Sequence, residues 1–250
     1  MAKINCIFCE QYGNKAKEHV WPMWLLDFMG ETGRGEFTGL HFNFPWSRPL
    51  SVRKQSIESL VYGNVCNKCN NGWMSELENQ CSPLLKDVIS NKEKAGPWEL
   101  REVKLIANWA FKTSVMINSG SNYRKIIGKD LIRVFYNTQS LPQSVTVDLA
   151  FLKSDELRLE WRQSQMFFIL GPEHIIKNVR CFLSSSFIIC LIINNFIIRV
   201  AYWEDNNCVL NPNNDKECKR IYPFERLISF RTTPVVDSIE SMSNSVVIYE

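Results

Sequence analysis

The sequence predicts an α+β protein built from a small zinc-held module at residues 1–95 and, at residues 96–250, a linking helix with an antiparallel β-rich domain. Three observations predict this class. Two Cys-x-x-Cys pairs lie in the N-terminal third, an amphipathic helical pattern follows Gly96-Pro97, and short β-branched runs fill most of the remainder.

Composition restricts the class of protein further. The chain has 250 residues, of which 45% are hydrophobic and 22% charged, as in an ordinary globular protein. A net charge of +3 is compatible with nucleic-acid binding through a local patch but does not require it. Nine cysteines, an odd number, with two spaced pairs and no signal peptide predict a reduced cytoplasmic protein that binds metal. The apolar runs within residues 187–202 are shorter than the roughly 20 residues of a membrane span, so no membrane is expected.

The cysteine pairs are Cys6 with Cys9 and Cys66 with Cys69. Each tight turn directs two thiolates to one point, which is how a tetrahedral zinc ion is commonly held. The distance between the pairs is far longer than the roughly 15–20 residues of a purely structural zinc ribbon. The enclosed segment carries Glu18-His19, and this pairing of a zinc clamp with an acid and a histidine indicates chemistry.

The N-terminal module is expected to begin with a short hairpin over residues 3–15 that carries the first cysteine pair. A strand over 18–21 follows, then a turn or short helix from Pro22. Glycines and prolines predict an extended loop over residues 30–50, which is either an ordinary connection or a substrate-contacting insertion. Residues 57–65 are expected to form a strand and turn that lead into the second pair.

Helical periodicity begins after Cys69. Asn70 or Asn71 is a suitable N-cap, and Pro83 predicts a break. Residues 98–117 predict a strong amphipathic helix that links the two parts.

The C-terminal part shows a period near two. Short strands without intervening helices indicate an antiparallel sheet, a sandwich or an open barrel. The strands are expected at residues 131–135, 145–151, 166–170, 187–203 and 226–231, and the fourth of these segments forms a β-hairpin about Asn194-Asn195.

The order Cys-x-x-Cys, Glu-His-Val-x-Pro, Cys-x-x-Cys-Asn resembles the HNH endonuclease family over residues 4–80. Lys-Glu-His-Val-Trp-Pro and Cys-Asn-Asn-Gly-Trp-Met-Ser-x-Leu-Glu resemble more narrowly a group of bacterial HNH-type proteins, and Trp109-Ala110-Phe111-Lys112-Thr113 also resembles that group. The resemblance implies a ββα fold that grips a catalytic divalent metal ion.

The resemblance also implies roles for single residues. His19 would be the general base that deprotonates a water, because the histidine pKa lies near working pH. Glu18 and Asn70 would be ligands of the catalytic ion, and an Asn carbonyl with a carboxylate and waters suits Mg²⁺ or Mn²⁺. Cys6, Cys9, Cys66 and Cys69 would bind the structural zinc.

The chain departs from the family pattern at two positions. The acid before the histidine is more often Asp in the family than Glu, and the middle Asn of the motif is missing at its usual offset, with Asn64 as the nearest candidate. Helical spacing places Glu78 on one face with Asn71 and Ser75. Glu78 is therefore either a further ligand in the catalytic site or a structural glutamate.

The remaining histidines and cysteines give weaker signals. His41 and His174 are expected to be ordinary surface or structural histidines, and Cys190 a core thiol. Cys208 and Cys218 flank a polar loop where a second metal site is not favoured. Three tryptophans near the motif are expected to pack the small module; they are Trp21, Trp24 and Trp73.

The sequence thus predicts a metal-dependent HNH endonuclease that hydrolyses DNA phosphodiester bonds, with the β-rich domain selecting substrate or contacting a protein partner or second copy. A setting in restriction or phage defence follows from the resemblance alone. The alternative is a non-catalytic, zinc-stabilised module that binds nucleic acid or protein, and the missing middle Asn favours it. A redox role is disfavoured because no βαβ pattern surrounds either cysteine pair.

Overall fold

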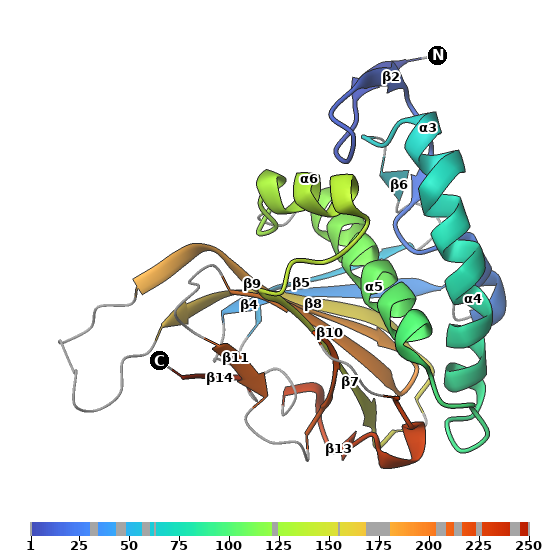
Figure 1. Cartoon of the computed structure of the whole chain (residues 1–250), viewed down its shortest axis with the longest axis vertical. Coiled ribbons are helices and arrows are strands. Elements are labelled where there is room, and N and C mark those ends of the chain that lie inside the picture. The colour runs from blue at the N-terminus through green and yellow to red at the C-terminus, as the bar shows by residue number, and fades with distance from the viewer. Residues whose placement is uncertain are drawn as a thin grey trace.

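The computed structural model describes residues 2–30, 35–43, 49–56, 61–62, 64–121, 125–154, 156–168, 181–203, 209–212, 217–223, 227–240 and 246–249. The protein is mixed α+β, and its centre is one eight-stranded sheet with helices on one face (Figure 1). The strands of this sheet are β4 (Glu36–Asn43), β5 (Pro49–Ser56), β7 (Val145–Leu152), β8 (Leu159–Phe168), β9 (Cys181–Ile193), β10 (Phe196–Tyr202), β12 (Lys219–Tyr222) and β13 (Val235–Val236). Their order is β12-β7-β10-β9-β8-β4-β5, and β13 pairs with β7.

The N-terminal segment forms short elements above one end of the sheet (Figure 1). The predicted first hairpin is confirmed as β1 (Lys3–Asn5) paired with β2 (Tyr12–Asn14). The next strand and the short helix are confirmed as β3 (Glu18–His19) and α1 (Met23–Met29). The predicted strand at 57–65 is present as β6 (Val61–Tyr62), while residues 57–60 and 63 lie outside the described part of the chain.

The prediction of an extended loop over residues 30–50 is wrong. Strand β4 and the start of strand β5 lie in this segment, and the two strands pair antiparallel with each other. Gly39 shows why its glycine content misled. It lies within β4, where an added Cβ would be 2.7 Å from Nε1 of Trp161, so the glycine allows a close approach inside a sheet. Strand β4 pairs parallel with β8, so residues of the segment 1–95 and of the segment 96–250 share one sheet.

The helical region after the second cysteine pair consists of α3 (Asn67–Cys69), the π-helical turn η2 (Asn70–Met74) and α4 (Ser75–Ser90). The predicted Asn cap is wrong, because Sγ of Cys66 accepts the capping hydrogen bond from the backbone N–H of Cys69 at 3.5 Å. The predicted break at Pro83 is also wrong, since Pro83 lies inside α4. Buried packing of the helix, through Leu85 and its neighbours, outweighs the roughly 3 kcal/mol cost of an interior proline.

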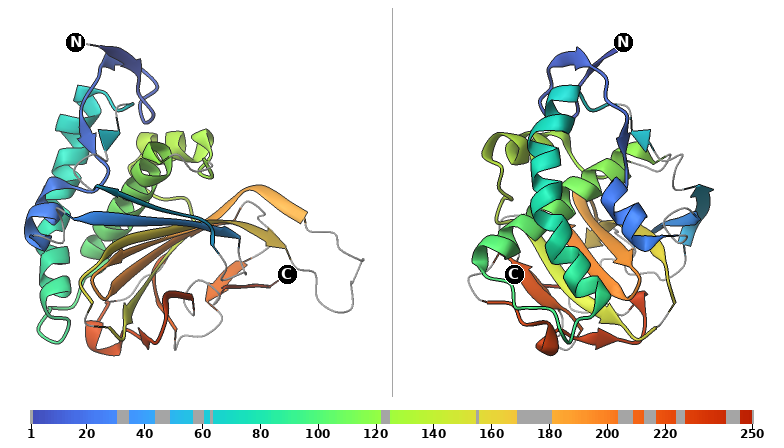
Figure 2. Two further views of the ribbon diagram at one scale, coloured as in Figure 1. Left: turned by 180° about the vertical axis from the view of Figure 1, so that it is seen from behind. Right: turned by 90° about the vertical axis from the view of Figure 1, so that its right-hand side faces the viewer.

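The predicted linking helix is confirmed as α5 (Leu100–Gly120), which begins at a capping box between Glu99 and Glu102. Its residues 109–118 are buried on every side, because α5 lies between the sheet and α4 (Figures 1 and 2). A single apolar face was expected, so the sequence pattern underestimates how central this helix is.

The predicted strand at residues 131–135 is wrong, because these residues belong to helix α6 (Lys129–Thr138). Leu131, Ile132 and Phe135 are buried, and Asp130 and Arg133 are exposed. This spacing fits a helix with one apolar face, but a short apolar run is also compatible with a strand.

The β-hairpin predicted at residues 187–203 is confirmed as β9 and β10, with Asn194 at φ 54° in the turn. The predicted strand at 226–231 is wrong for the described residues. Ile228 makes an isolated bridge to Trp98, and a 3-10 turn follows as η4 (Phe230–Thr232). The remaining pair is β11 (Val209–Pro212) with β14 (Val246–Tyr249), on the side of the sheet away from the helices (Figure 1).

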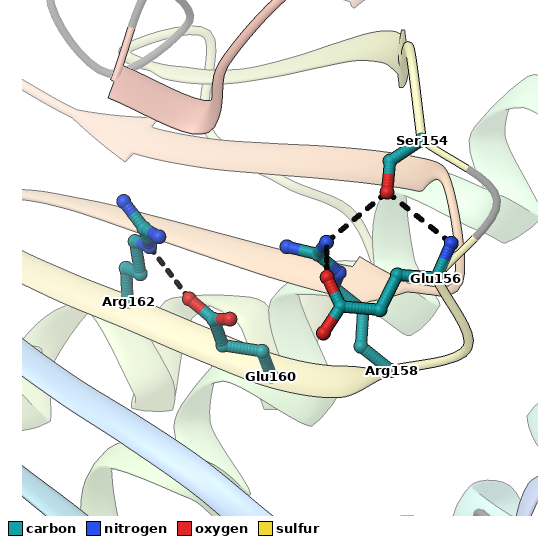
Figure 3. A network of polar contacts seen from close by, with 5 residues as sticks. All are labelled: Ser154, Glu156, Arg158, Glu160 and Arg162. Atoms are coloured by element: carbon teal, nitrogen blue, oxygen red, sulfur yellow. Dashed lines mark hydrogen bonds and ion pairs between the residues drawn. The ribbon is translucent and has the colours of Figure 1, made fainter.

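The sheet has a hydrophobic core on each face. Ile198 of β10 belongs to the large core beneath the helices, and its neighbour Ile197 belongs to a smaller core with Trp203 and Val236. A partly exposed polar network lies just before β8, where Oγ of Ser154 accepts hydrogen bonds from Arg158 and from the backbone N–H of Glu156 (Figure 3). No helix in the described part of the chain is long and apolar enough to cross a membrane.

Candidate metal centre and active site

The two cysteine pairs form one cluster. The four Sγ atoms of Cys6, Cys9, Cys66 and Cys69 all lie within 4.8 Å of one another, and those of Cys9 and Cys66 are 3.7 Å apart. Thiolates at about 2.3 Å from a tetrahedral zinc ion would be separated by roughly 3.8 Å. A hydrogen bond to Cys69 lowers the pKa of Cys6 to about 4. The cluster can therefore bind one metal ion such as zinc.

Backbone hydrogen bonds align the two pairs. The N–H of Ile7 donates to the carbonyl of Asn64 at 2.9 Å, which joins the first turn to the segment before Cys66. The aromatic ring of Trp73 packs edge-on against Phe8 with centroids 5.1 Å apart, and against Phe135 of α6 at 5.9 Å. The prediction that Trp73 packs the small module is confirmed, and Trp73 also joins the module to α6.

The strand that carries Glu18 and His19 lies beside the segment that leads into the second cysteine pair. In the antiparallel β3–β6 pair, Glu18 lies opposite Tyr62 and His19 opposite Val61. The pairing continues toward the cysteines, because the N–H of Ala16 donates to the carbonyl of Val65 at 2.8 Å. Two paired strands followed by a helix are thus assembled around the cysteine cluster, in the order β3, β6, α4.

His19 and Asn70 each present a buried polar atom without a partner. Among the described residues, neither Nδ1 of His19 nor Oδ1 of Asn70 takes part in a hydrogen bond. The amide nitrogen of Asn70 donates to Oδ1 of Asn71 at 3.2 Å. A buried polar atom left unpaired costs free energy, so such atoms usually bind a water, an ion or a ligand. Each of these atoms can therefore bind a water, and the amide oxygen of Asn70 also suits a hard cation.

Glu18 is half-buried in a charged neighbourhood. Burial raises the pKa of Glu18, the ammonium of Lys112 offsets part of this increase, and the carboxylate of Glu78 adds to it. Glu18, Glu78 and Lys112 therefore lie within electrostatic range of one another. This local group holds two carboxylates and one ammonium.

Glu78 is fixed by three donors. Its Oε2 accepts hydrogen bonds from Nε1 of Trp24 at 2.5 Å and of Trp109 at 2.9 Å, and its Oε1 forms an ion pair with Nζ of Lys112. Of the two roles that the sequence left open for Glu78, these contacts favour that of a structural glutamate. They connect α4 to α1 and α5. Trp24 thus packs the module as predicted.

The three residues that helical spacing placed on one face, Asn71, Ser75 and Glu78, differ in burial, and Asn71 lies outside α4. Asn71 and Ser75 are exposed, whereas Glu78 is buried. For Asn71 the physical reason is a kink at Gly72, whose backbone at φ −99° and ψ −117° interrupts the helix before α4 begins at Ser75. Residues before the kink and after it therefore do not follow one 3.6-residue period.

The other candidates have structural partners or lie elsewhere. His41 lies on β4, where its Nδ1 and Nε2 of Gln163 are 3.1 Å apart. Cys190 is a buried thiol, as predicted, and Cys218 lies 3.4 Å from the guanidinium of Arg199. His174 and Cys208 lie outside the described residues. Asn64 lines a surface cavity of about 360 Å³ next to Cys6.

Sequence reasoning assigned no role to Lys112, which is fully buried on α5. One signal could have identified it. Lys112 stands inside the apolar run of α5 between Phe111 and Val115, and a lysine almost never occupies such a position without a buried anionic partner. The partner itself, 34 residues earlier, is not evident from the sequence.

Comparisons with known proteins add no relative: no family model, no curated protein and no solved structure matches the chain.

Proposed function

We propose that the chain is a metal-dependent endonuclease of HNH type that hydrolyses DNA phosphodiester bonds. The observation that carries the proposal is the arrangement of β3 beside β6 at the four-cysteine cluster, with buried unpaired atoms on His19 and Asn70. The sequence motif points to His19 and Asn70 independently of the fold.

In this function His19 accepts a proton from the attacking water through its unpaired Nδ1. Glu18 and Asn70 hold a divalent cation, Mg²⁺ or Mn²⁺, through a carboxylate and an amide oxygen. The cation, when bound, supplies positive charge to the scissile phosphate and the leaving oxygen. Zinc on the four cysteines is structural, and the large sheet supports substrate selection or partner contacts.

The direct test is cleavage of a plasmid by the purified protein with Mg²⁺ or Mn²⁺, beside the His19→Ala variant. Loss of the general base is expected to lower the rate by about 10²–10⁴-fold while the zinc content stays at one ion per chain. A variant that cleaves like the wild type would refute the role of His19.

The role of the zinc is tested with Cys66→Ser. Structural zinc sites supply folding free energy, and Cys66 also caps α3, so the module around β3 and β6 is expected to unfold and cleavage to be lost. Circular dichroism and zinc analysis measure this. A folded, zinc-free variant with native stability would contradict the clamp.

One observation favours a second function, a non-catalytic module that binds nucleic acid or protein. The ammonium of Lys112 already places a positive charge near Glu18, where the catalytic cation would act. Binding of DNA without cleavage, by a protein that carries zinc and does not bind Mn²⁺, would support this alternative.

A further inference from the structure

A cavity of about 410 Å³ lies where four segments of the chain meet. Its walls come from the C-terminal ends of α1 and α4, from the segment between β7 and β8, and from the turn between β9 and β10. Small-molecule sites commonly have volumes of roughly 300–1,000 Å³. The described lining residues include none of the candidate metal centre or active site, so the cavity is a separate feature of the molecule.

Backbone hydrogen bonds fix the turn that forms one wall. The N–H of Asn194 donates to the carbonyl of Arg158 at 2.7 Å, and the N–H of Leu152 donates to the carbonyl of Asn195 at 2.6 Å. The turn is therefore tied at both of its residues to the segment that forms the next wall. This part of the cavity is formed before any ligand binds.

The side chain of Asn194 brings an unpaired acceptor to the cavity. Its Oδ1 is buried and has no hydrogen-bond partner among the residues that the structure describes, and Asn194 lines the cavity. A buried acceptor without a donor costs free energy. A ligand that donates a hydrogen bond at this position would remove that cost.

The end of α4 adds further acceptors. The helix ends at Ser90, and the N–H groups that would continue it bond elsewhere: that of Glu93 donates to Oδ1 of Asn91 at 3.0 Å, and that of Lys94 to the carbonyl of Asn91 at 3.1 Å. The carbonyls of Ile89 and Ser90 therefore do not receive these helical hydrogen bonds. Both residues line the cavity, which thus lies at the negative end of the α4 dipole.

The remaining wall combines one carboxylate with apolar side chains. Glu156 lines the cavity and forms an ion pair with Arg158 (Figure 3). The ammonium of Lys86 lies 5.9 Å from the ring centroid of Phe28, which also lines the cavity. The apolar lining residues are Phe28, Met29, Ile89 and Leu157. The cavity thus offers acceptors for a donor and hydrocarbon surface for an apolar stem.

We infer that this cavity binds the alkylammonium group of a small organic amine. The ammonium donates a hydrogen bond to Oδ1 of Asn194, and its alkyl stem packs on the apolar wall. An ammonium carries three N–H donors and no acceptor, which matches a lining rich in acceptors, and its positive charge suits the C-terminal end of a helix. The inference goes beyond the proposed nuclease and does not rest on it, because different residues take part.

The test measures dissociation constants by isothermal titration calorimetry with pentylamine as the probe. Two analogues separate its features: 1-pentanol keeps a donor but lacks the charge, and pentyltrimethylammonium keeps the charge but has no N–H. Charge-assisted hydrogen bonds are the stronger ones, so pentylamine should bind about tenfold tighter than either analogue. It should also raise the melting temperature as its concentration increases.

Asn194→Gly removes the acceptor without straining the turn, because glycine readily adopts the φ of 54° found there. Pentylamine binding should weaken about tenfold, while binding of pentyltrimethylammonium should not change. Asn194→Asp keeps an acceptor at this place and should bind pentylamine at least as tightly as the wild type. Lys86→Met removes a neighbouring positive charge and should tighten binding about twofold.

Gln139→Gly is the matched control for the glycine variant. Gln139 also has a positive φ, 51°, but it stands at the end of α6 and does not line the cavity. Its pentylamine binding should equal that of the wild type.

Three results would overturn the inference. One is a wild type that does not bind pentylamine at concentrations up to about 10 mM. Another is equal binding of pentylamine and 1-pentanol, which would mark an apolar cavity that does not recognise an ammonium. The third is an Asn194→Gly variant that binds pentylamine like the wild type. If Asn194→Gly does not fold, Asn194→Asp decides, and a tenfold weaker binding by that variant overturns the role of the acceptor.

Discussion

Two groups of buried charges in this protein differ in one respect, the balance of their signs. In the sheet, Asp148 of β7 lies directly opposite Arg199 of β10 and Arg220 of β12. Its Oδ2 accepts from Arg199 at 2.8 Å and its Oδ1 from Arg220 at 2.6 Å. One carboxylate thus has two guanidinium partners, whereas the ammonium of Lys112 pairs with Glu78 while also acting electrostatically on Glu18.

The pKa shifts follow this difference. Burial alone would raise the pKa of Asp148, but Arg199 and Arg220 outweigh it and the pKa is lowered. Burial raises the pKa of Glu18, and Lys112 compensates only in part. A carboxylate held ionised by two guanidinium groups fits a structural role, and a carboxyl with a raised pKa is a candidate for function.

The largest expected effect concerns Asp148 and its two guanidinium partners. Asp148→Asn removes the carboxylate that pairs with the buried guanidinium of Arg199, which should lower the free energy of unfolding by about 3–5 kcal/mol. The lowered pKa means that the ionised form stabilises the fold above the unfolded pKa of about 3.9, and that this contribution is lost as pH falls through the folded value. Urea unfolding at pH 7 and over pH 2–5 measures both effects.

The same variant tests the comparison. Its dissociation constant for Mn²⁺ should equal that of the wild type, because Asp148 belongs to the sheet and not to the candidate site. A large change in Mn²⁺ binding at unchanged stability would show that the two groups are not separate in function.

The parts of the fold that follow from local sequence could be predicted. The cysteine pairs, β3, α5 and the β9–β10 hairpin each carry a complete signal within a few residues: a ligand spacing, a helical period, or an Asn-Asn turn between β-branched runs. Strands β4 and β5 could not be predicted, because the reason for Gly39 is the indole of Trp161, which is distant in the sequence.

In the candidate site, too, some residues could be predicted from local sequence and others could not. The motif identified Glu18, His19 and Asn70, which stand as candidates on β3 and at the start of η2. It could not decide the role of Glu78, since the decisive partners are Lys112, Trp24 and Trp109, which are distant in the sequence. Buried ion pairs depend on tertiary contacts that no local period records.

An intermediate effect is expected where α5 meets the candidate strand. An added Cβ on Gly120 would lie 2.9 Å from Cγ2 of Val20, the residue after His19, and 3.5 Å from Cβ of Tyr62. Val20 is buried and its branched side chain is stiff, so Gly120→Ala should displace β3 and cost about 1–3 kcal/mol of stability. Thermal melting and the rate of plasmid cleavage should both fall.

Gly96→Ala is the matched control for this variant, because a Cβ there has no atom within 4 Å. Its stability and cleavage should equal those of the wild type. If Gly120→Ala cleaves DNA normally despite a lower melting temperature, the position of β3 is not critical for the proposed chemistry.

The smallest expected effect is a gain in stability, whereas the variants above lose stability. It tests most directly whether the carboxyl of Glu18 differs in role from that of Asp148. Glu18→Gln removes one carboxylate from the group of Glu18, Glu78 and Lys112. Because the pKa of Glu18 is raised, its ionised form destabilises the fold at neutral pH, and the stability it contributes when protonated is lost as pH rises through the folded pKa. Without divalent cations at pH 7, the variant should therefore be more stable than the wild type by about 0.5–2 kcal/mol, the range common for single stabilising substitutions.

The same variant should lose Mn²⁺ binding and DNA cleavage. A variant that is less stable and still binds Mn²⁺ would place Glu18 with Asp148 among the structural carboxylates, and the two groups of buried charge would then differ only in their number of partners.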